Sequence, residues 1–416
     1  MEQVALSRAA SEAAAGALVD GRPATLGAAA DAAATLLLRA VYPLVYGLER
    51  ATVEAQRRAV EIAELLGAAI DPGSSAGHGA ALLAFQRIGQ VTATLGEVRN
   101  RADLLVFWGI DPDAVHPGFL ARFAAPAPGA PPRRTLAVDV GAARGPAGAD
   151  ERLEVPVERE FEVLWALRAR VRGRRIEPAH AGAAEGWPDA RLHDVAARLL
   201  GCRYGVIFYD AEPPAGNRDP MRPLALGALA AEASRRTRLR LIGVRRPGNG
   251  AGAETVLTWQ TGFPFAVHFG RGYPRYGPGE FTAEAVLARG EADAALLVGA
   301  DPLRELSPAA VAFLERVPAV VVGSAEAWAG PGTRVRIVTP SFEELPGSVY
   351  RMDGVALRRR GAAAAAPVAA GVPVGAARRG AAAGAAEPVG GAEPADAAVL
   401  GALVAVLRRR LAEAGR

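Results

Sequence analysis

The sequence predicts an α/β protein made of two related, doubly wound (Rossmann-like) domains with mostly parallel sheets. Short apolar runs alternate with segments of helical periodicity along most of the 416 residues, as in consecutive βαβ units. Residues 104–108 are all apolar, which is typical of a strand buried on both faces. This run ends in Gly-Ile-Asp-Pro, and a second run at 295–298 ends in Gly-Ala-Asp-Pro, so we interpret the two domains as related.

The composition predicts a soluble, cytoplasmic protein without a disulfide framework. Half of the residues are hydrophobic, which is enough for two or three packed domains. The single cysteine, Cys202, excludes any metal or iron–sulfur site built from the cysteines of this chain alone. Residues 1–20 do not resemble a signal peptide. No run approaches the roughly 18 uninterrupted apolar residues of a membrane span.

The basic residues do not predict nucleic-acid binding. All 48 are arginine, which raises the pI to about 9.6, although the formal net charge is only +4. They are interleaved with Asp and Glu and do not form a basic stripe with aromatic platforms.

The amino-terminal part begins with a predicted strand-turn at 17–23 and an alanine-rich helix at 26–39, which together make up a segment at 1–40. The first α/β domain is expected at 41–200. Its first strand, 42–46, precedes a helix that begins after the N-cap Thr52, and its next strand is 68–70.

A Gly/Ser-rich loop is predicted at residues 70–80, after the strand at 68–70 and before a helix through 82–87. Loops at the ends of buried strands are where α/β proteins bind ligands. His78 lies in the middle of this loop, beside Gly77. A lone histidine in a loop is more often structural than catalytic, so both interpretations of His78 stay open.

The second α/β domain is expected at 201–345, with strands at 205–209, 239–244 and 295–298. Its loop at 246–252, which contains Asn249 and Gly250, is the counterpart of the loop at 70–80. If the two domains face each other, these loops line one cleft. The alternative to two related domains is that any two parallel strands commonly end in similar turns.

An aromatic segment without helical or strand periodicity occupies residues 257–280. A loop of this length inside a compact domain is usually functional. Its Arg271 and Arg275 are suited to binding phosphate or carboxylate groups. The alternative is an aromatic plug that closes a domain interface.

The carboxy-terminal part is predicted to contain a core segment at 346–360, an Ala/Gly/Pro linker at 361–395 and an amphipathic helix at 396–416. The helix carries Leu400, Leu403 and Leu407 on one face. This face needs an apolar partner, either the core of the same chain or another subunit.

Four stretches of the sequence resemble the B subunits of formylmethanofuran dehydrogenases, which are members of the molybdopterin oxidoreductase superfamily. The most specific is the Arg-Gly-Tyr-Pro-Arg-Tyr segment, and the matches together span most of residues 20–360. They lie at 52–80, with a Ser-Ser-x-x-His-Gly pattern, and at 94–109, 257–280 and 350–354. The resemblance implies the fold of that superfamily.

Two departures from the family imply that this chain is not a redox subunit. Tungsten- or molybdenum-dependent members carry a metal-binding cysteine immediately before the histidine of the first loop, where this sequence has Gly77. They also carry an amino-terminal cysteine cluster for a [4Fe–4S] centre, and this chain begins after that point. Thiolate ligation and an electron path are what such chemistry requires.

This pattern resembles the B subunits of bacterial formyltransferase/hydrolase complexes. The resemblance implies a scaffold that holds a hydrolase (A), a C subunit and a formyltransferase (D), which convert formyl-tetrahydromethanopterin to formate in one-carbon metabolism. The methanofuran-type carrier has a polyglutamate tail, for which the arginine-rich surface is a hypothetical electrostatic track. We then expect no catalytic residue, cofactor or metal in this chain, and only the remnants of a site. These are a remnant cleft of Gly77, His78, Arg271 and Arg275 and a remnant cofactor loop of Asn249 and Gly250.

Two alternatives remain open at the level of the sequence. One is an active tungsten- or molybdenum-pterin oxidoreductase with His78, Arg271 and Arg275 at the metal–pterin cleft. The other is a binding module that retains a pterin or nucleotide fragment without chemistry.

Overall fold

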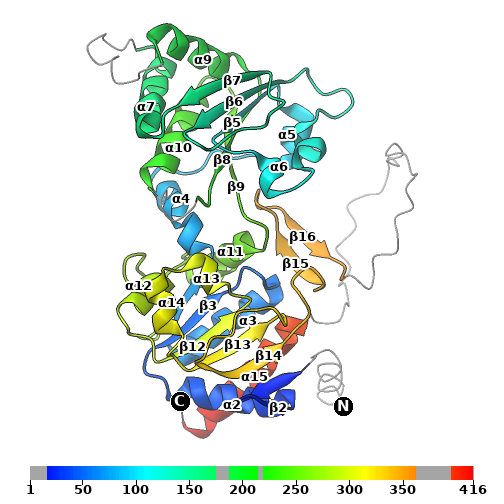
Figure 1. Ribbon diagram of the computed structural model, residues 1–416, viewed down its shortest axis with the longest axis vertical. Coiled ribbons are helices and arrows are strands. Elements are labelled where there is room, and N and C mark those ends of the chain that lie inside the picture. Colours follow the sequence, from blue (N-terminus) through cyan, green and yellow to red (C-terminus); the bar gives the residue numbers. More distant parts are fainter. Residues whose placement is uncertain (1–15, 175–186, 214–218, 362–394, 416) are drawn as a thin grey trace. The chain divides into compact units, whose positions relative to one another are not determined.

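The computed structural model describes residues 16–174, 187–213, 219–361 and 395–415, and it confirms the α/β fold class (Figure 1). The described strands form a nine-stranded, a five-stranded and a two-stranded sheet. The chain divides into two compact units. Unit 1 comprises residues 1–73, 252–349 and 356–416, and unit 2 comprises residues 74–251 and 350–355.

Unit 1 contains the nine-stranded sheet, in the order β11-β10-β4-β3-β12-β13-β14-β1-β2. Its five central strands run parallel, and each edge is closed by two short antiparallel strands. The central strands are β4 (Ala69–Pro72), β3 (Pro43–Gly47), β12 (Ala294–Val298), β13 (Ala319–Gly323) and β14 (Thr333–Val338). The edge strands are β10 (Val267–His268), β11 (Arg275–Tyr276), β1 (Ala17–Val19) and β2 (Arg22–Ala24).

Unit 2 contains the five-stranded sheet, which is parallel throughout, in the order β7-β6-β5-β8-β9. The chain starts at the central strand β5 and continues through β6 to β7 at one edge of the sheet. It then returns to β8, beside β5, and ends with β9 at the other edge. The order therefore reverses between β5 and β8, which is the switch point of a doubly wound sheet. The strands are β5 (Leu104–Trp108), β6 (Arg134–Val140), β7 (Glu151–Val155), β8 (Gly205–Asp210) and β9 (Leu239–Val244).

The predicted division into contiguous domains at 41–200 and 201–345 is wrong. The early strand β3 pairs with the late strand β12, in the register Leu44 to Ala295, and not with β5. Unit 2 is therefore inserted into unit 1. The two Gly-x-Asp-Pro turns end β5 and β12, which belong to different sheets. Local patterns could not show this, because every buried parallel strand carries the same apolar signal.

Helices account for most of the remaining described residues. In unit 2 these are α4 (Ser75–Ile88), α5 (Leu95–Arg101), α6 (Pro112–Val115), the π-helical turn Leu120–Ala124, the 3₁₀ turn Val157–Arg159, α7 (Glu160–Val171), α9 (Asp189–Gly201) and α10 (Met221–Ala233). In unit 1 they are α2 (Leu26–Arg39), α3 (Val53–Leu66), α12 (Ala283–Ala288), α13 (Pro302–Glu305), α14 (Pro308–Leu314) and α15 (Ala395–Glu413), and α11 (Gly250–Thr261) contains the unit boundary. No helix in the described ranges is both long and apolar enough to cross a membrane.

The two ends of the chain follow the prediction closely where they are described. The strand-turn and helix expected in residues 1–40 are β1, β2 and α2. The terminal helix is α15, and it packs against α2 and α3 of its own unit, so its apolar face is covered by its own core. Asp396 fixes its first turn by accepting hydrogen bonds from the backbone N–H and the hydroxyl of Thr52. The predicted linker lies, apart from residues 361 and 395, outside the described residues.

The predicted core segment at 346–360 is a two-stranded sheet of β15 (Gly347–Tyr350) and β16 (Ala356–Arg359). Residues 350–355, which comprise the end of β15 and the turn between these strands, belong to unit 2. There the Asp353 carboxylate accepts a hydrogen bond from the backbone N–H of Leu95, at 2.7 Å.

Candidate functional site

The stretch at 70–80 is a short turn followed directly by a helix, and not the long loop that the sequence predicted. β4 ends at Pro72 and α4 begins at Ser75, so Gly77 and His78 lie in the first turn of α4. Their backbone N–H groups donate to the carbonyl oxygen of Ser74, at 3.0 and 2.7 Å. The His78 side chain is only 7% exposed and meets the ring edge of Phe85. The start of this helix could not be predicted from the sequence, because glycine and serine also favour turns.

The space beside Gly77 is filled by Glu212. A Cβ atom added at Gly77 would lie 3.1 Å from the Cβ atom and 3.4 Å from the Cα atom of Glu212. Glu212 is itself fixed, since its carboxylate accepts from the Arg245 Nε atom at 2.6 Å and from the backbone N–H of Arg246 at 2.9 Å. His116 donates its Nε2–H to the Arg245 carbonyl oxygen at 2.7 Å. A larger residue at position 77 therefore requires this buried ion pair to move.

A second buried ion pair occupies the switch point of the five-stranded sheet. The Glu160 carboxylate accepts from the Trp108 Nε1 atom at 2.7 Å and from the Arg222 Nε atom at 2.9 and 3.0 Å. Arg222 also donates to the carbonyl oxygen of Asp210 at 3.2 Å. Gly109, with φ of +61°, is so close that a Cβ atom there would lie 3.3 Å from the Arg222 Nη2 atom.

This position matters because doubly wound sheets bind their ligands at the carboxyl ends of the strands, at the switch point. Trp108 is the last residue of β5 and Asp210 the last residue of β8. The side chains of Glu160 and Arg222 are only 7% and 10% exposed, respectively. The charged groups at this edge thus neutralise one another inside unit 2.

A small cavity lies beside Arg222. This cavity, of about 10 Å³, is lined by residues that include Tyr209, Asp210, Asp219 and Arg222. The buried Tyr209 hydroxyl has no hydrogen-bond partner among the described residues, and burial raises its pKa far above the usual range. Burial also raises the pKa of Asp210. A cavity of this size holds about one water molecule, whereas small-molecule sites measure roughly 300–1,000 Å³.

The second predicted loop has a structural role in unit 2. Asn249 is fully buried, and its Oδ1 atom accepts a hydrogen bond from the backbone N–H of Tyr350 at 2.8 Å. Gly250 is the first residue of α11. Asn249 therefore holds the start of the segment at 350–355, one of the four stretches that carry the family resemblance.

The aromatic segment contains a short hairpin, β10–β11, that the sequence did not predict. His268 of β10 is stacked between the rings of Tyr42 and Phe281, with both centroid distances at 4.9 Å. Arg275 of β11 donates to the His268 Nδ1 atom at 3.0 Å and lies over the ring of Phe281 at 4.8 Å. Burial, and then the positive charge of Arg275, lower the pKa of His268.

Of the two interpretations of this segment, the contacts of Arg275 favour packing, because it is part of a stack within unit 1. Arg271 is exposed, next to the tight turn at Gly272. The predicted cleft residues thus lie in different units. Arg271 and Arg275 belong to unit 1, and Gly77, His78, Asn249 and Gly250 belong to unit 2. The helix α11, which begins at Gly250, continues into unit 1. His268 was missed because a two-residue strand has no detectable period.

The described side chains do not provide a metal centre. No group of three or more His, Cys, Asp or Glu residues within those ranges is arranged to hold a metal ion. Cys202, which follows α9, is buried, and its thiol donates to the Leu199 carbonyl oxygen. Burial raises the pKa of this thiol.

The chain is similar to curated B subunits from archaea and bacteria, although no family model matches it. It is 34% identical over 343 residues to the B subunit of the tungsten-containing formylmethanofuran dehydrogenase 2 of Methanocaldococcus jannaschii, and the match covers 80% of this chain and 77% of that relative. It is 33% identical over 291 residues to the B subunit of the formyltransferase/hydrolase complex Fhc of Methylorubrum extorquens, with coverages of 68% and 74%.

A solved structure resembles the whole chain. It is a chain in the X-ray structure of the formyltransferase/hydrolase complex FhcABCD of Methylorubrum extorquens, in complex with methylofuran. The TM-score is 0.72 and the sequence identity 26%, and the match covers 96% of this chain and 99% of that chain.

Proposed function

This chain belongs to the family of formylmethanofuran dehydrogenase B subunits, and we propose that it is the non-redox B subunit of a formyltransferase/hydrolase complex. In this role it holds a hydrolase, a C subunit and a formyltransferase together. The assembly passes a formyl group from formyl-tetrahydromethanopterin through a methanofuran-type carrier to formate. The chain itself contributes no catalytic residue.

The observation that carries this proposal is the environment of Gly77. The active relatives need a thiolate at this position, and here the adjacent space contains Glu212, bound by Arg245. The second ion pair, of Glu160 and Arg222, fills the switch point. The buried charged pairs and the water-sized cavity at this edge of unit 2 support the proposal that no metal–pterin group is bound there. We therefore propose that no cofactor is bound in unit 2.

The competing function is that of the redox subunit of an active tungsten- or molybdenum-dependent dehydrogenase. Overall identity does not decide between the two, because it is 34% to a tungsten-containing relative and 33% to the Fhc relative, although the first match covers 80% and the second 68% of this chain. The local difference at Gly77 favours the non-redox role.

Purification of the complex from a native extract tests this proposal. We expect the tagged full-length chain to bring down hydrolase-, C- and formyltransferase-type subunits in stoichiometric amounts, identified by mass spectrometry. We also expect far less than one equivalent of tungsten, molybdenum or pterin. Stoichiometric metal and pterin would show the redox function instead, and recovery of the chain without partners would overturn the scaffold role.

A Gly77→Cys variant serves as the matched control, because it restores the missing thiol. We expect it to remain free of metal and pterin, since Glu212 occupies the adjacent space. If this single substitution gave stoichiometric metal and pterin, unit 2 would still contain a competent cofactor site.

A further inference from the structure

We propose that a pocket in unit 1, between α2 and the amino-terminal ends of β12, β13 and β14, docks a neighbouring protein of the same assembly. The docked segment presents an apolar side chain next to a carboxylate. The proposal rests on the proposed function in one respect, which is that the partner belongs to that assembly.

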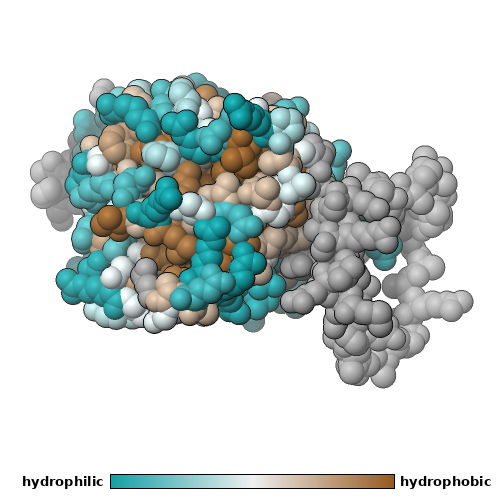
Figure 2. Space-filling view, turned by 90° about the horizontal axis from the view of Figure 1, so that it is seen from below, coloured by the Kyte–Doolittle hydropathy of each residue, from teal (hydrophilic) through white to brown (hydrophobic). Residues whose placement is uncertain are grey.

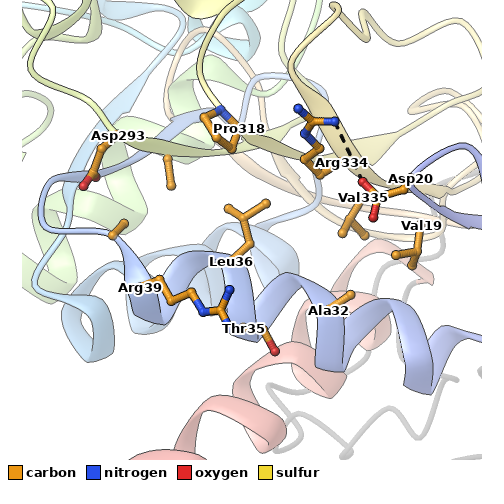
Figure 3. Close-up of a pocket in the computed structure, with 12 residues that line it drawn as sticks. Val19, Asp20, Ala32, Thr35, Leu36, Arg39, Asp293, Pro318, Arg334 and Val335 are labelled. Atoms are coloured by element: carbon orange, nitrogen blue, oxygen red, sulfur yellow. Dashed lines mark ion pairs between the residues drawn. The ribbon is translucent and has the colours of Figure 1, made fainter.

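The pocket has the shape and lining of a recognition site. It measures about 450 Å³ and is open to solvent. Most of its lining is apolar, and Leu36 rises from α2 toward Pro318 and Arg334 (Figure 3). The other apolar residues are Val19, Ala32, Ala40, Ala294 and Val335. Such a floor accepts one or two aliphatic or aromatic side chains, and burying them contributes about 25 cal/mol per Å² of apolar surface.

The location favours a protein partner over a small cofactor. Ala294 is the first residue of β12, Pro318 immediately precedes β13, and Val335 lies near the start of β14. The pocket is thus at the amino-terminal edge of the parallel strands. Small ligands of doubly wound sheets bind at the opposite, carboxyl-terminal edge.

An exposed valine follows a lining residue of this pocket in the sequence. Val41, which directly follows Ala40, is 90% exposed. Its backbone is fixed, because the N–H groups of Val41 and Tyr42 donate to the Asp293 carboxylate at 2.7 and 2.9 Å. One exposed valine is ordinary in itself. A valine held rigidly beside an apolar pocket is the arrangement that a protein interface uses, since little entropy is lost when it is covered.

The charged residues around the pocket indicate which charge the docked segment of the partner carries. Asp293 uses both carboxylate oxygens for backbone N–H groups, and Asp20 lies 4.0 Å from Arg334. Asp31, the acidic residue of α2, is paired with Arg409 and Arg410. Arg39 is exposed and has no ion-pair partner among the described residues. A carboxylate on the incoming segment would meet Arg39, which can bind it through two parallel hydrogen bonds.

The lower face of unit 1 carries both apolar and hydrophilic surface (Figure 2). Figure 2 shows apolar surface between hydrophilic ridges on the face seen from below, where Figure 1 places α2 and α15. An apolar centre with a polar, charged rim is typical of protein–protein contacts.

A Val41→Asp/Arg39→Glu double variant of the full-length chain tests the proposal. Both side chains are exposed, so we expect the melting temperature of the chain to fall only slightly, through the loss of the favourable Arg39 charge in the last turn of α2. We expect the recovery of at least one partner protein to fall by about tenfold or more, which corresponds to a loss of about 1.4 kcal/mol or more of binding free energy. Arg57→Glu is the matched control, since Arg57 is exposed on α3 and does not line the pocket.

The possible outcomes separate this proposal from its rivals. Full recovery of all partners by the double variant would overturn it. Two other results would reassign the pocket. One is a dimer of the wild-type chain that the double variant loses, and the other is a small carboxylate that native mass spectrometry finds only in the wild type. If the wild-type chain recovers no partner at all, this result contradicts the proposed function and not only the assignment of the pocket.

Discussion

At the scale of single residues, unit 2 is organised by buried charges whose partners are distant in the sequence. Glu160 and Arg222 are 62 residues apart, and Arg245 and Glu212 are 33 apart. An ion pair of this kind stabilises little on balance, because both charges lose their hydration. Its loss is costly, because the remaining charge is then buried without a partner.

We predict that Glu160→Ala lowers the free energy of unfolding by about 3–5 kcal/mol, because it leaves Arg222 and the Trp108 Nε1 atom without their acceptor. Urea denaturation of the full-length chain measures this. Glu158→Ala is the control, since Glu158 is exposed nearby. An equal, small effect of both substitutions would contradict the role that we assign to Glu160.

The sequence could not reveal these residues, although it did identify the region. Gly77 and His78 were singled out by local composition and by the family resemblance. Glu160, Glu212 and Arg222 were missed because no local pattern marks an acid whose partner arrives from another part of the fold. The start of α4 was hidden by residues that favour turns as much as helix ends.

At the scale of elements, long periodic segments were predictable and short ones were not. The terminal helix was identified from its apolar face, and α15 buries Leu400, Leu403 and Leu407. The hairpin β10–β11 was not identified, because its strands have two residues each. Side-chain stacking around His268 holds this hairpin at the edge of the nine-stranded sheet.

The hairpin should weaken in mild acid. Because the folded protein lowers the pKa of His268, the stability that this group contributes is complete above the unfolded pKa of about 6.5. It is lost as the pH falls from there through the lower, folded pKa. We expect melting temperatures to drop between pH 7.5 and 5.5, and His268→Phe to reduce this drop while it keeps an aromatic ring in the stack.

The control for this experiment is the exposed His193, and His193→Gln should leave the pH dependence as in the wild type. Hydrogen exchange at both pH values locates the effect, with faster exchange expected in residues 267–276 at the lower pH. An unchanged pH dependence in His268→Phe would show that other groups are responsible.

At the scale of the whole molecule, the fold class was predictable and the division into units was not. Apolar runs show that strands exist and that they are buried. They do not show which strands pair, because β3 would bury the same surface beside β5 as it does beside β12. Only the register of β3 with β12 reveals that unit 2 is an insertion.

Two matched core substitutions test this division. Leu296 of β12 and Leu105 of β5 are both fully buried in the middle of their sheets. Truncation of either to alanine should cost about 2–5 kcal/mol. We expect Leu296→Ala to accelerate hydrogen exchange in β3 and β4 as well as in β13, although these strands are far apart in the sequence.

Leu105→Ala should accelerate exchange in β6, β8 and β9 and leave β3 and β4 unchanged. If both substitutions gave the same exchange pattern, the two sheets would open as one cooperative unit. If Leu296→Ala affected only β12 and β13, unit 1 would not be cooperative across its two halves.

The insertion of unit 2 has a consequence for the folding of the protein during its synthesis on the ribosome. β3 and β4 are translated before unit 2, yet β3 lacks one of its two neighbouring strands until β12 has been made. Meanwhile all five strands of the sheet in unit 2 emerge in one continuous stretch of chain. The inserted sheet can therefore form first. Until β12 is made, one apolar edge of β3 is unpaired and exposed, so it must be protected from aggregation with other nascent chains.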